Sequence, residues 1–330
     1  MEREPRISVV MSVYNAAKYL REAVESILNQ TFSDFEFIII EDKSTDDSLN
    51  ILLSYNDPRI VLILNNENVG LTKNLNIGIK KARGEFIARM DADDISLSNR
   101  FEEQIQFIKD NRCNICFSQV IYYGKEKKEV LSQFSTKLDL VSAELLFRNP
   151  VAHSTAMWRK DFFVLNNLFY DEAYIYSQDY ELWTRVEEKC NIYVIDKSLL
   201  MYRFHNNQIG SSKSAEQTSF FKKANNDFIT RKYNNVDISE SINVIFNCKL
   251  TRDNYDIFIG RINSILNLHD EKLNLLLYYF LPRMIVMNGL NYYNLRIYFS
   301  LRNLMNNSFY KLSYRQRLSF FLKCILNFSN

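Results

Sequence analysis

The sequence lacks an uninterrupted apolar run long enough to cross a membrane. A membrane-spanning helix needs about 18 or more consecutive apolar residues. The longest candidate, from Leu273 to Met287, is interrupted by Pro282 and Arg283. We therefore expect no membrane-spanning helix in this chain.

An excess of charge of one sign is also missing. Lys and Arg total 41 against 39 Asp and Glu, so the net charge does not favour nucleic acid as a partner, and any basic surface must be local. The length of 330 residues predicts one large domain and a smaller one, and a hydrophobic content of 47% is enough for a substantial core.

Cysteine is scarce, and its number is odd. The chain has no secretory signal at its N-terminus, so we expect a reducing cytosolic environment and no disulfides. Cys113 and Cys116 form a CxxC pair, but a zinc ribbon needs a second pair, which the sequence lacks. We predict that both are ordinary core residues. The cysteines are Cys113, Cys116, Cys190, Cys248 and Cys324.

What the sequence does have is a regular alternation of apolar strands and amphipathic helices. Strands of this kind, buried on both faces, are typical of parallel sheets. The alternation predicts an α/β fold with a doubly wound, mostly parallel sheet. Gly84 lies where we expect a helix C-terminal cap. The predicted strands are 7–13, 35–40, 60–64 and 85–90, and the predicted helices lie near 20–28, 47–55 and 71–82.

From about Lys213 onward turn signals become rare, and long helical segments rich in Phe, Tyr, Leu and Asn dominate. We place a domain boundary there, with residues 1–212 as the α/β domain and 213–330 as a helical C-terminal region. The segment from Leu273 to Asn330 has seven Lys and Arg and no Asp or Glu. Aromatic residues lie between these cations, as in helices that bind an anionic membrane surface, but a helical core or an oligomer interface would explain the pattern as well.

Polar residues come directly after each predicted strand, and in α/β sheets ligands bind beyond these carboxyl ends. A dinucleotide site would need a Gly-rich turn after the first strand. The chain has only seven glycines and places Tyr14 and Asn15 there instead. The same absence argues against a sugar-nucleotide pyrophosphorylase, which needs a Gly-rich basic loop. A metal ion is then the obvious group to neutralise a bound diphosphate.

Asp91 and Asp93 supply a candidate metal site, because alternate residues of an extended segment point to the same side. A divalent cation held there would stabilise a diphosphate leaving group. An Asp-x-Asp pair alone is a weak signal, since solvated acidic loops are common. Its position directly after an apolar strand strengthens the metal interpretation.

Several segments together resemble the ordered motifs of the family 2 inverting glycosyltransferases, which have the GT-A fold. The resemblance covers roughly residues 7 to 212 and is closest to members that build bacterial lipooligosaccharide or capsule. It implies transfer of a Gal, Glc, GlcNAc or GalNAc type of sugar from a UDP-sugar to a glycan acceptor. The motifs are 12–15 (Ser-Val-Tyr-Asn), 41–46 (Glu-Asp-Lys-Ser-Thr-Asp), 68–70 (Asn-Val-Gly), 91–94 (Asp-Ala-Asp-Asp), 149–158, 177–183 (Ser-Gln-Asp-Tyr-Glu-Leu-Trp) and 202–208 (Tyr-Arg-Phe-His-Asn-Asn-Gln).

The resemblance implies how the donor is bound. Asp42 matches the residue that accepts a hydrogen bond from N3–H of uracil, a contact that cytosine cannot make. Tyr14 matches a residue placed against the base, although it would also suit a core position. Lys43 departs from the family, which usually has a small residue there, and this makes the local turn uncertain. The donor-binding residues are expected to be Val13, Tyr14, Asn15, Asp42, Asn68, Asp91 and Ala92.

The resemblance also implies the metal ligands and the catalytic base. Asp93 would bind Mn²⁺ or Mg²⁺ directly, with Asp91 as a further ligand and His205 as a contact to the metal or to the diphosphate. Asp94 would cap the next segment of the chain. Asp179 matches the base that takes the proton of the acceptor hydroxyl, at the start of a helix that buries Leu182, Trp183 and Val186. Glu181 points elsewhere on that helix and is a poor substitute. Acceptor contacts are expected from Gln178, Trp183 and His153, although core packing would explain Trp183 as well. Arg203 is expected to contact the acceptor or the diphosphate.

The acceptor of such an enzyme would be a glycan carried on a lipid or free, and the protein would lie in the cytoplasm or against the inner face of the membrane. A competing interpretation is a non-catalytic sugar-nucleotide-binding or scaffolding protein with a decayed transferase domain. The presence of Asp91, Asp93 and Asp179 together argues against decay.

Overall fold

The computed structural model describes residues 4–124, 127–146, 148–205, 208 and 213–233. The chain divides into two compact units, of which the first comprises Met1–Val141 and Asn149–Asn225 and the second Ser142–Arg148 and Asn226–Asn330. All predicted site residues belong to the first unit.

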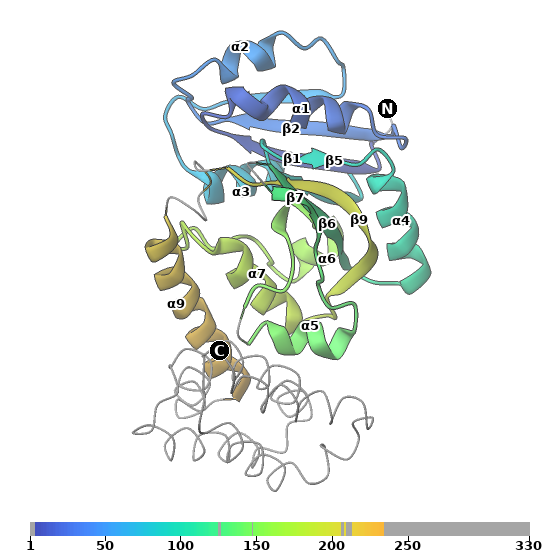
Figure 1. Cartoon of the computed structure of the whole chain (residues 1–330), viewed down its shortest axis with the longest axis vertical. Coiled ribbons are helices and arrows are strands. Elements are labelled where there is room, and N and C mark those ends of the chain that lie inside the picture. Colours follow the sequence, from blue (N-terminus) through green and yellow to red (C-terminus); the bar gives the residue numbers. More distant parts are fainter. Residues whose placement is uncertain (1–3, 125–126, 147, 206–207, 209–212, 234–330) are drawn as a thin grey trace, which may run out of the picture. The chain divides into compact units, whose positions relative to one another are not determined.

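The predicted alternation of strands and helices over the first 90 residues is confirmed (Figure 1). The elements there are β1 (Ile7–Val13), α1 (Ala17–Leu28), β2 (Phe35–Glu41), α2 (Ser48–Leu53), β3 (Ile60–Leu64), α3 (Leu71–Lys81) and β4 (Phe86–Met90). The later elements are β5 (Ile95–Ser96), α4 (Arg100–Asn111), β6 (Ile115–Gly124), β7 (Lys127–Leu131), α5 (Leu138–Glu144), the 3-10 helix η1 (His153–Thr155), β8 (Met157–Arg159), α6 (Lys160–Leu165), α7 (Gln178–Glu187), β9 (Tyr193–Arg203) and α9 (Ser214–Tyr233).

The strands form one nine-stranded sheet in the order β3-β2-β1-β4-β8-β6-β9-β5, with β7 paired to β6. Strands β3, β2, β1 and β4 are parallel to one another, as expected. Beyond β4 the sheet is mixed, because β8 runs antiparallel to both β4 and β6 while β9 is parallel to β6. The carboxyl ends of β1, β2 and β4 therefore meet at one edge.

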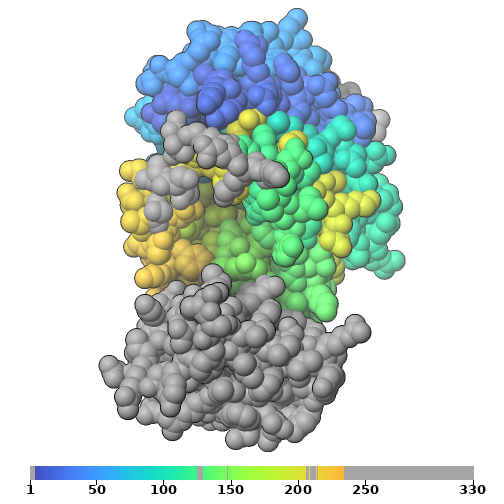
Figure 2. Space-filling model, in the orientation of Figure 1, coloured from blue at the N-terminus to red at the C-terminus, as the bar shows by residue number. Residues whose placement is uncertain are grey.

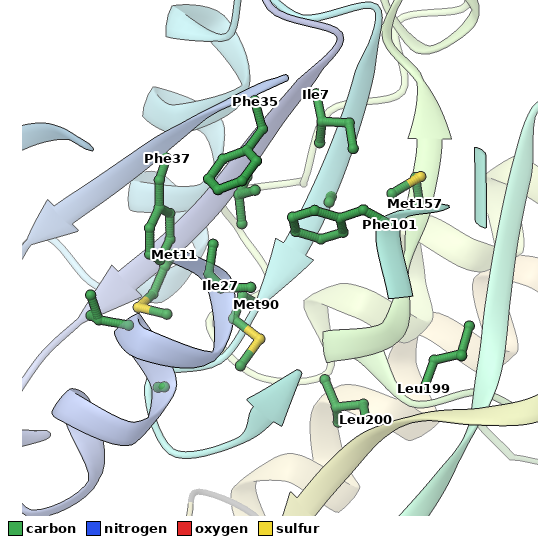
Figure 3. Close-up of a cluster of buried hydrophobic side chains, with 14 of the residues drawn as sticks. Ile7, Met11, Ile27, Phe35, Phe37, Met90, Phe101, Met157, Leu199 and Leu200 are labelled. Carbon is green, nitrogen blue, oxygen red and sulfur yellow. The ribbon is translucent and has the colours of Figure 1, made fainter. Parts of the chain in front are cut away.

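Helices cover both faces of the parallel half of the sheet. Alternate residues of β1 such as Ile7 and Met11 pack into one hydrophobic cluster with Ile27 of α1 and Phe101 of α4 (Figure 3). The residues between them face α3, where Gly78 lets the helix approach closely: a Cβ at this position would lie 2.4 Å from a methyl carbon of Val10. Burial on both faces explains why these strands read as continuous apolar runs.

The expectation that Gly84 caps a helix is wrong. Helix α3 ends at Lys81 and its cap is Ala82, so Gly84 lies in the loop beyond the cap. A Cβ at Gly84 would lie 2.6 Å from the backbone nitrogen of Ser8. Glycine is needed here because the chain passes directly against β1.

Cys113 and Cys116 are buried and not disulfide-bonded, so the prediction that they are core residues is confirmed. The predicted boundary after residue 212 falls just before α9, whose residues up to Asn225 belong to the first unit. The basic and aromatic segment from Leu273 lies outside the described residues. Within the part of the chain that is described, no helix has the length and apolar character needed to cross a bilayer.

Candidate active site

The loops after β1, β2 and β4 bring most of the predicted donor and metal residues to one edge of the sheet. Tyr14 and Asn15 follow β1, Asp42 follows β2, and the segment 91–94 follows β4. Figure 2 shows the blue N-terminal segments and the green segments that follow β4 as one continuous surface of the first unit. The parallel register of the three strands produces this convergence.

The carboxylates of Asp91, Asp93 and Asp94 form the acidic cluster of the site. One oxygen from each lies within 4.8 Å of the others, and this is the group of metal-ligand type found among the described residues. Asp91 and Asp93 are partly exposed, whereas Asp94 is buried. The first two are therefore the members that a ligand from solvent can reach.

Asp94 holds the cluster to neighbouring elements. Its Oδ2 accepts a 2.7 Å hydrogen bond from the hydroxyl of Ser154, and its Oδ1 accepts a 3.0 Å bond from the backbone N–H of Arg203. Burial raises the pKa of the Asp94 carboxyl well above its usual range, and the charges of Asp93 and Asp91 raise it further. Asp94 was expected to cap the next segment of the chain, and its carboxylate instead binds residues that are distant in the sequence.

His205 lies next to the acidic cluster, as the sequence predicted. Its Nε2 is 2.8 Å from Oδ2 of Asp93, and its ring is 4.9 Å from the ring of Tyr19 on α1. Carboxylate oxygens and one imidazole nitrogen form a donor set that fits Mn²⁺ or Mg²⁺, with imidazole favouring Mn²⁺. The residues present therefore fit a divalent cation bound by Asp93, with Asp91 and His205 beside it.

Arg89 lies beneath the cluster and was not identified from the sequence. Its side chain is 2% exposed, and its Nη2 is 2.5 Å from Oδ1 of Asp91. Its Nε and Nη1 have no hydrogen-bond partner among the described residues. Burial raises the pKa of Asp91, and the charge of Arg89 opposes that shift. A single charged residue in the apolar strand Phe86–Met90 was the signal that could have revealed it.

Asp179 lies in the first turn of α7, after Ser177, which has a left-handed backbone with φ of 54°. Its Oδ2 accepts a hydrogen bond of 2.6 Å from Nδ2 of Asn149. Burial raises the pKa of Asp179, while hydrogen bonds from the Tyr180 backbone and from Asn149, together with the charge of Arg89, limit the rise. A partly exposed carboxylate with a raised pKa suits a general base.

The other acidic residue in the first turn of α7 is already engaged. Both oxygens of Glu181 bind Arg185, with two N–O distances of 2.7 Å. The helix buries Leu182, Trp183 and Val186 completely, as predicted. Asp179 is therefore carried on a well-anchored helix. Unlike Glu181, it forms no ion pair with a described residue.

The residues expected to bind the acceptor differ in their burial and in their contacts. The ring of Trp183 has no exposed surface and packs edge-on against Phe117, so the expectation of an acceptor contact is wrong and the residue belongs to the core. Gln178 is 6% exposed. Nε2 of His153 is 2.7 Å from the hydroxyl of Tyr170. Burial, and then the charge of Arg89, lowers the pKa of His153 well below its usual value, so this ring is neutral at physiological pH.

Asp42 joins β2 to the loop after β3. Its Oδ1 accepts hydrogen bonds from Nδ2 of Asn65 at 2.8 Å and from the backbone N–H of Val69 at 2.9 Å. Its Oδ2 accepts a further bond of 2.9 Å from the backbone N–H of Gly70. A carboxylate offers about four acceptor sites. The bonds that hold the loop thus take about three of them, and Asp42 is only 1% exposed, so the uracil contact stays a prediction.

Tyr14 is 49% exposed, so it has a ring face available beside the site rather than a core position. Asn68 is exposed, whereas Val13 and Ala92 are buried, so these two could contact a donor only through backbone atoms at the surface. Asn15 accepts a 2.8 Å bond from the backbone N–H of Thr45 and so ties the loop after β2 to the loop after β1.

The N-terminus of α1 is filled by side chains of the 44–48 segment. The backbone N–H of Asn15 donates to Ser44, that of Ala16 to Ser48 and that of Ala17 to Asp46, over 2.9 to 3.0 Å. These are the donors that a dinucleotide site would offer to a pyrophosphate. Their occupation agrees with the absence of a Gly-rich turn, and it leaves phosphate charge to be neutralised elsewhere.

The backbone of Lys43 gives the conformation of the turn after β2, which the sequence left uncertain. It has a left-handed backbone with φ of 61°, and its side chain is exposed. Its backbone N–H donates a 3.2 Å bond to Oε2 of Glu41. The position therefore requires the conformation that glycine adopts without strain, and this chain adopts it with lysine.

Comparisons with known proteins agree with this geometry. Residues 8–169 match the family model described as Glycosyl transferase family 2. A Haemophilus influenzae protein described as an uncharacterized glycosyltransferase is 33% identical over 250 residues, which cover 72% of this chain and 77% of that protein. WfaP of Escherichia coli, named a UDP-Glc:alpha-D-GlcNAc-diphosphoundecaprenol beta-1,3-glucosyltransferase, is 29% identical over 214 residues, which cover 64% of this chain and 82% of WfaP.

The fold is similar to that of S. aureus TarS. The crystal structure of TarS 1-349 in complex with UDP-GlcNAc has a TM-score of 0.59 and 18% sequence identity, and the match covers 86% of this chain and 89% of that one. At this level of identity the likeness confirms the GT-A-type fold alone.

Proposed function

Because the chain belongs to glycosyl transferase family 2 and is a glycosyltransferase, we propose that it transfers a sugar from a UDP-sugar to a hydroxyl of a bacterial surface glycan, with inversion and with the help of a divalent cation. The observation that carries this proposal is the division of the carboxylates into two groups. Asp91 and Asp93 lie with His205 at the end of β4, whereas Asp179 comes from α7, is hydrogen-bonded to Asn149 and lies near enough for its charge to raise the pKa of Asp91.

Asp179 takes the proton of the acceptor hydroxyl as its oxygen attacks the anomeric carbon. The attack comes from the face opposite the UDP leaving group, so the product has the inverted configuration. Burial raises the pKa of Asp179, which makes the carboxylate a better proton acceptor than an exposed aspartate. The hydrogen bonds from Asn149 and from the Tyr180 backbone hold this carboxylate in place.

Asp93 would hold Mn²⁺ or Mg²⁺, together with Asp91 and His205. The bound cation would supply positive charge to the diphosphate as it leaves. Arg89 fixes Asp91 from below through the 2.5 Å ion pair, so that the carboxylate is already oriented when the donor arrives. Preorganised charges of this kind account for a large part of catalysis in many enzymes.

The assignment of a uracil nucleotide is supported by Tyr14, which presents an exposed ring for stacking. Asp42, which is 1% exposed and anchors the neighbouring loop, is proposed to accept the hydrogen bond from N3–H of uracil. WfaP is named as using UDP-Glc, and TarS has been crystallised with UDP-GlcNAc. We therefore assign the donor to the UDP-hexose class, with Glc, Gal, GlcNAc and GalNAc as the sugars to be tested.

The acceptor is proposed to be a lipooligosaccharide or capsule glycan, carried on a lipid. The name of WfaP specifies a diphosphoundecaprenol-linked acceptor, which supports this choice. Gln178 and His153 are proposed to contact the acceptor. The protein would then work at the cytoplasmic face of the membrane, with the C-terminal region as its contact to anionic lipid.

The function is tested by incubating the full chain with each of the four UDP-sugars and measuring release of UDP with Mn²⁺, with EDTA, and with Mn²⁺ restored. We expect slow release that EDTA abolishes and Mn²⁺ restores. Asp93→Ala should lose this release, whereas Asp110→Ala, at an exposed position on α4, should retain it. Binding of UDP-sugar without release under any condition would favour the non-catalytic alternative, and release that is insensitive to EDTA would exclude the metal.

A further inference from the structure

Arg203, at the end of β9, is enclosed rather than open to a substrate. Its side chain is 12% exposed. The guanidinium carbon lies 4.4 Å from the ring centroid of Tyr19 on α1 and 4.6 Å from that of Tyr123 on β6. The cation therefore contacts two aromatic rings, whose electron-rich faces attract a guanidinium group.

The edge of the same guanidinium is also engaged. Its Nε donates a 2.8 Å hydrogen bond to the backbone carbonyl of Asp93, and its Nη2 lies 2.7 Å from Oε2 of Glu22 on α1. With two rings against it and two of three nitrogens occupied, Arg203 is poorly placed to bind a diphosphate or an acceptor. This removes the role in direct binding that the sequence had left open.

The contacts of Arg203 and its neighbours connect the two segments that carry the proposed metal ligands. The side chain of Arg203 binds the carbonyl of Asp93, and two residues further along the chain Nε2 of His205 meets Oδ2 of the same Asp93 at 2.8 Å. The backbone N–H of Arg203 binds Asp94 as well. Tyr19 contacts both Arg203 and His205. The loop after β4 and the end of β9 are thus joined at three points by one residue and its neighbours.

We propose that Arg203 is a positioning residue that holds Asp93 and His205 together in the arrangement that receives the divalent cation. The inference rests on the proposed metal-dependent function. Lysine would keep the charge but could neither stack flat against the rings nor donate through a planar fork, so Arg203→Lys should not preserve the arrangement. Partners that orient metal ligands in this way typically change metal affinity by about 10- to 100-fold when removed.

The test is the affinity of the full chain for Mn²⁺ in the presence of saturating UDP, measured by the loss of the free Mn²⁺ signal in electron paramagnetic resonance. We expect Arg203→Lys and Tyr123→Leu each to weaken Mn²⁺ binding by about 10-fold or more. Tyr123→Phe retains the ring, and the hydroxyl that it removes has no partner among the described residues, so it should bind Mn²⁺ as the wild type does. Tyr123 contacts Arg203 but is not a proposed ligand, which makes the pair of Tyr123 variants decisive.

Affinity for UDP in EDTA, measured by calorimetry, separates this role from a direct phosphate contact. The positioning role predicts that both Arg203→Lys and Tyr123→Leu keep the wild-type affinity for UDP in EDTA, which also shows that they fold. Wild-type Mn²⁺ affinity in Tyr123→Leu, or a loss of UDP affinity in EDTA for Arg203→Lys as large as its loss of Mn²⁺ affinity, would overturn the inference. If the wild type itself takes up no Mn²⁺ with UDP, the proposed metal-dependent function fails, and the inference falls with it.

Discussion

Nδ2 of Asn149 donates a hydrogen bond of 2.6 Å to Oδ2 of Asp179 across 30 residues of sequence. Together with the hydrogen bond from the Tyr180 backbone, it holds the carboxylate against rotation. It also favours the ionised form of Asp179, in opposition to burial, which favours the neutral form. The position and the proton affinity of the proposed base therefore depend on a residue from a different segment.

Asp179→Asn should abolish transfer and leave UDP-sugar binding nearly unchanged. The amide has almost the same shape as the carboxylate but cannot accept the proton, and loss of a positioned base typically lowers the rate by about 10² to 10⁴. Turnover and donor affinity are measured on the same preparation. Undiminished turnover would remove Asp179 from the mechanism.

Asn149→Ala should move the acid limb of the pH profile of kcat/KM to higher pH. The hydrogen bond from Asn149 lowers the pKa of Asp179, so its removal allows the pKa, already raised by burial, to rise further. A larger fraction of the base is then protonated at a given acidic pH, and the rate declines earlier as pH falls. Asn111→Ala, on exposed α4 surface, is the control. An acid limb at the wild-type pH would show that Asn149 does not tune the base.

UDP should protect the protein against heat better than CDP or GDP, and Asp42→Ala should flatten that ranking. The same substitution should lower the melting temperature without nucleotide, because it leaves the donors on Asn65, Val69 and Gly70 without their acceptor. Each buried donor left unpaired costs about 1 to 3 kcal/mol. The contact to uracil is contradicted if all three nucleotides protect the wild type equally.

Lys43→Gly should raise the free energy of unfolding by up to about 1 kcal/mol. The left-handed backbone costs an ordinary residue roughly 1 to 2 kcal/mol, and the greater freedom of glycine in the unfolded chain offsets part of the gain. Arg112→Gly is a matched control, because Arg112 ends α4 with φ of 49°. Urea unfolding curves of the two variants should shift in the same direction. A loss of UDP affinity in Lys43→Gly alone would show that the lysine also reaches the phosphates.

The full chain should sediment with anionic liposomes at low salt and be released as ionic strength rises, because the cations between Leu273 and Asn330 have no acidic residues beside them in the sequence. A chain that ends at Lys272 should lose this binding. If the full chain ignores anionic vesicles at low salt, the membrane contact is excluded and the segment has a structural role.

The parallel half of the sheet could be predicted from the sequence, and the mixed half could not. Strands β1, β2 and β4 are buried on both faces, so each is a largely apolar run followed by a polar loop. Strand β8 has three residues, Met157–Arg159, and β5 has two, which is too short for a periodic signal. Their pairing depends on partners more than 40 residues away, and such contacts produce no pattern in the local sequence.

Prediction of the site from the sequence is limited in the same way. Asp93, His205 and Asp179 could be proposed because they match motifs of the family that lie next to element ends. Asn149 and Arg89 could not be proposed, because the contacts of an amide in a loop and of a cation within a strand depend on the tertiary structure. The residue type of Trp183 suits sugars, but its spacing with Leu182 also fits the buried face that it occupies.

Strand β9 is made late but lies between β6 and β5 in the sheet. Its residues from Tyr193 to Arg203 leave the ribosome after the whole loop of Asp91–Asp94 has been made. Until then this acidic loop has neither Arg203 to bind its backbone nor His205 to meet Asp93. A nascent chain that ends before His205 therefore lacks one member of the proposed cation site, however well β1 to β4 have folded.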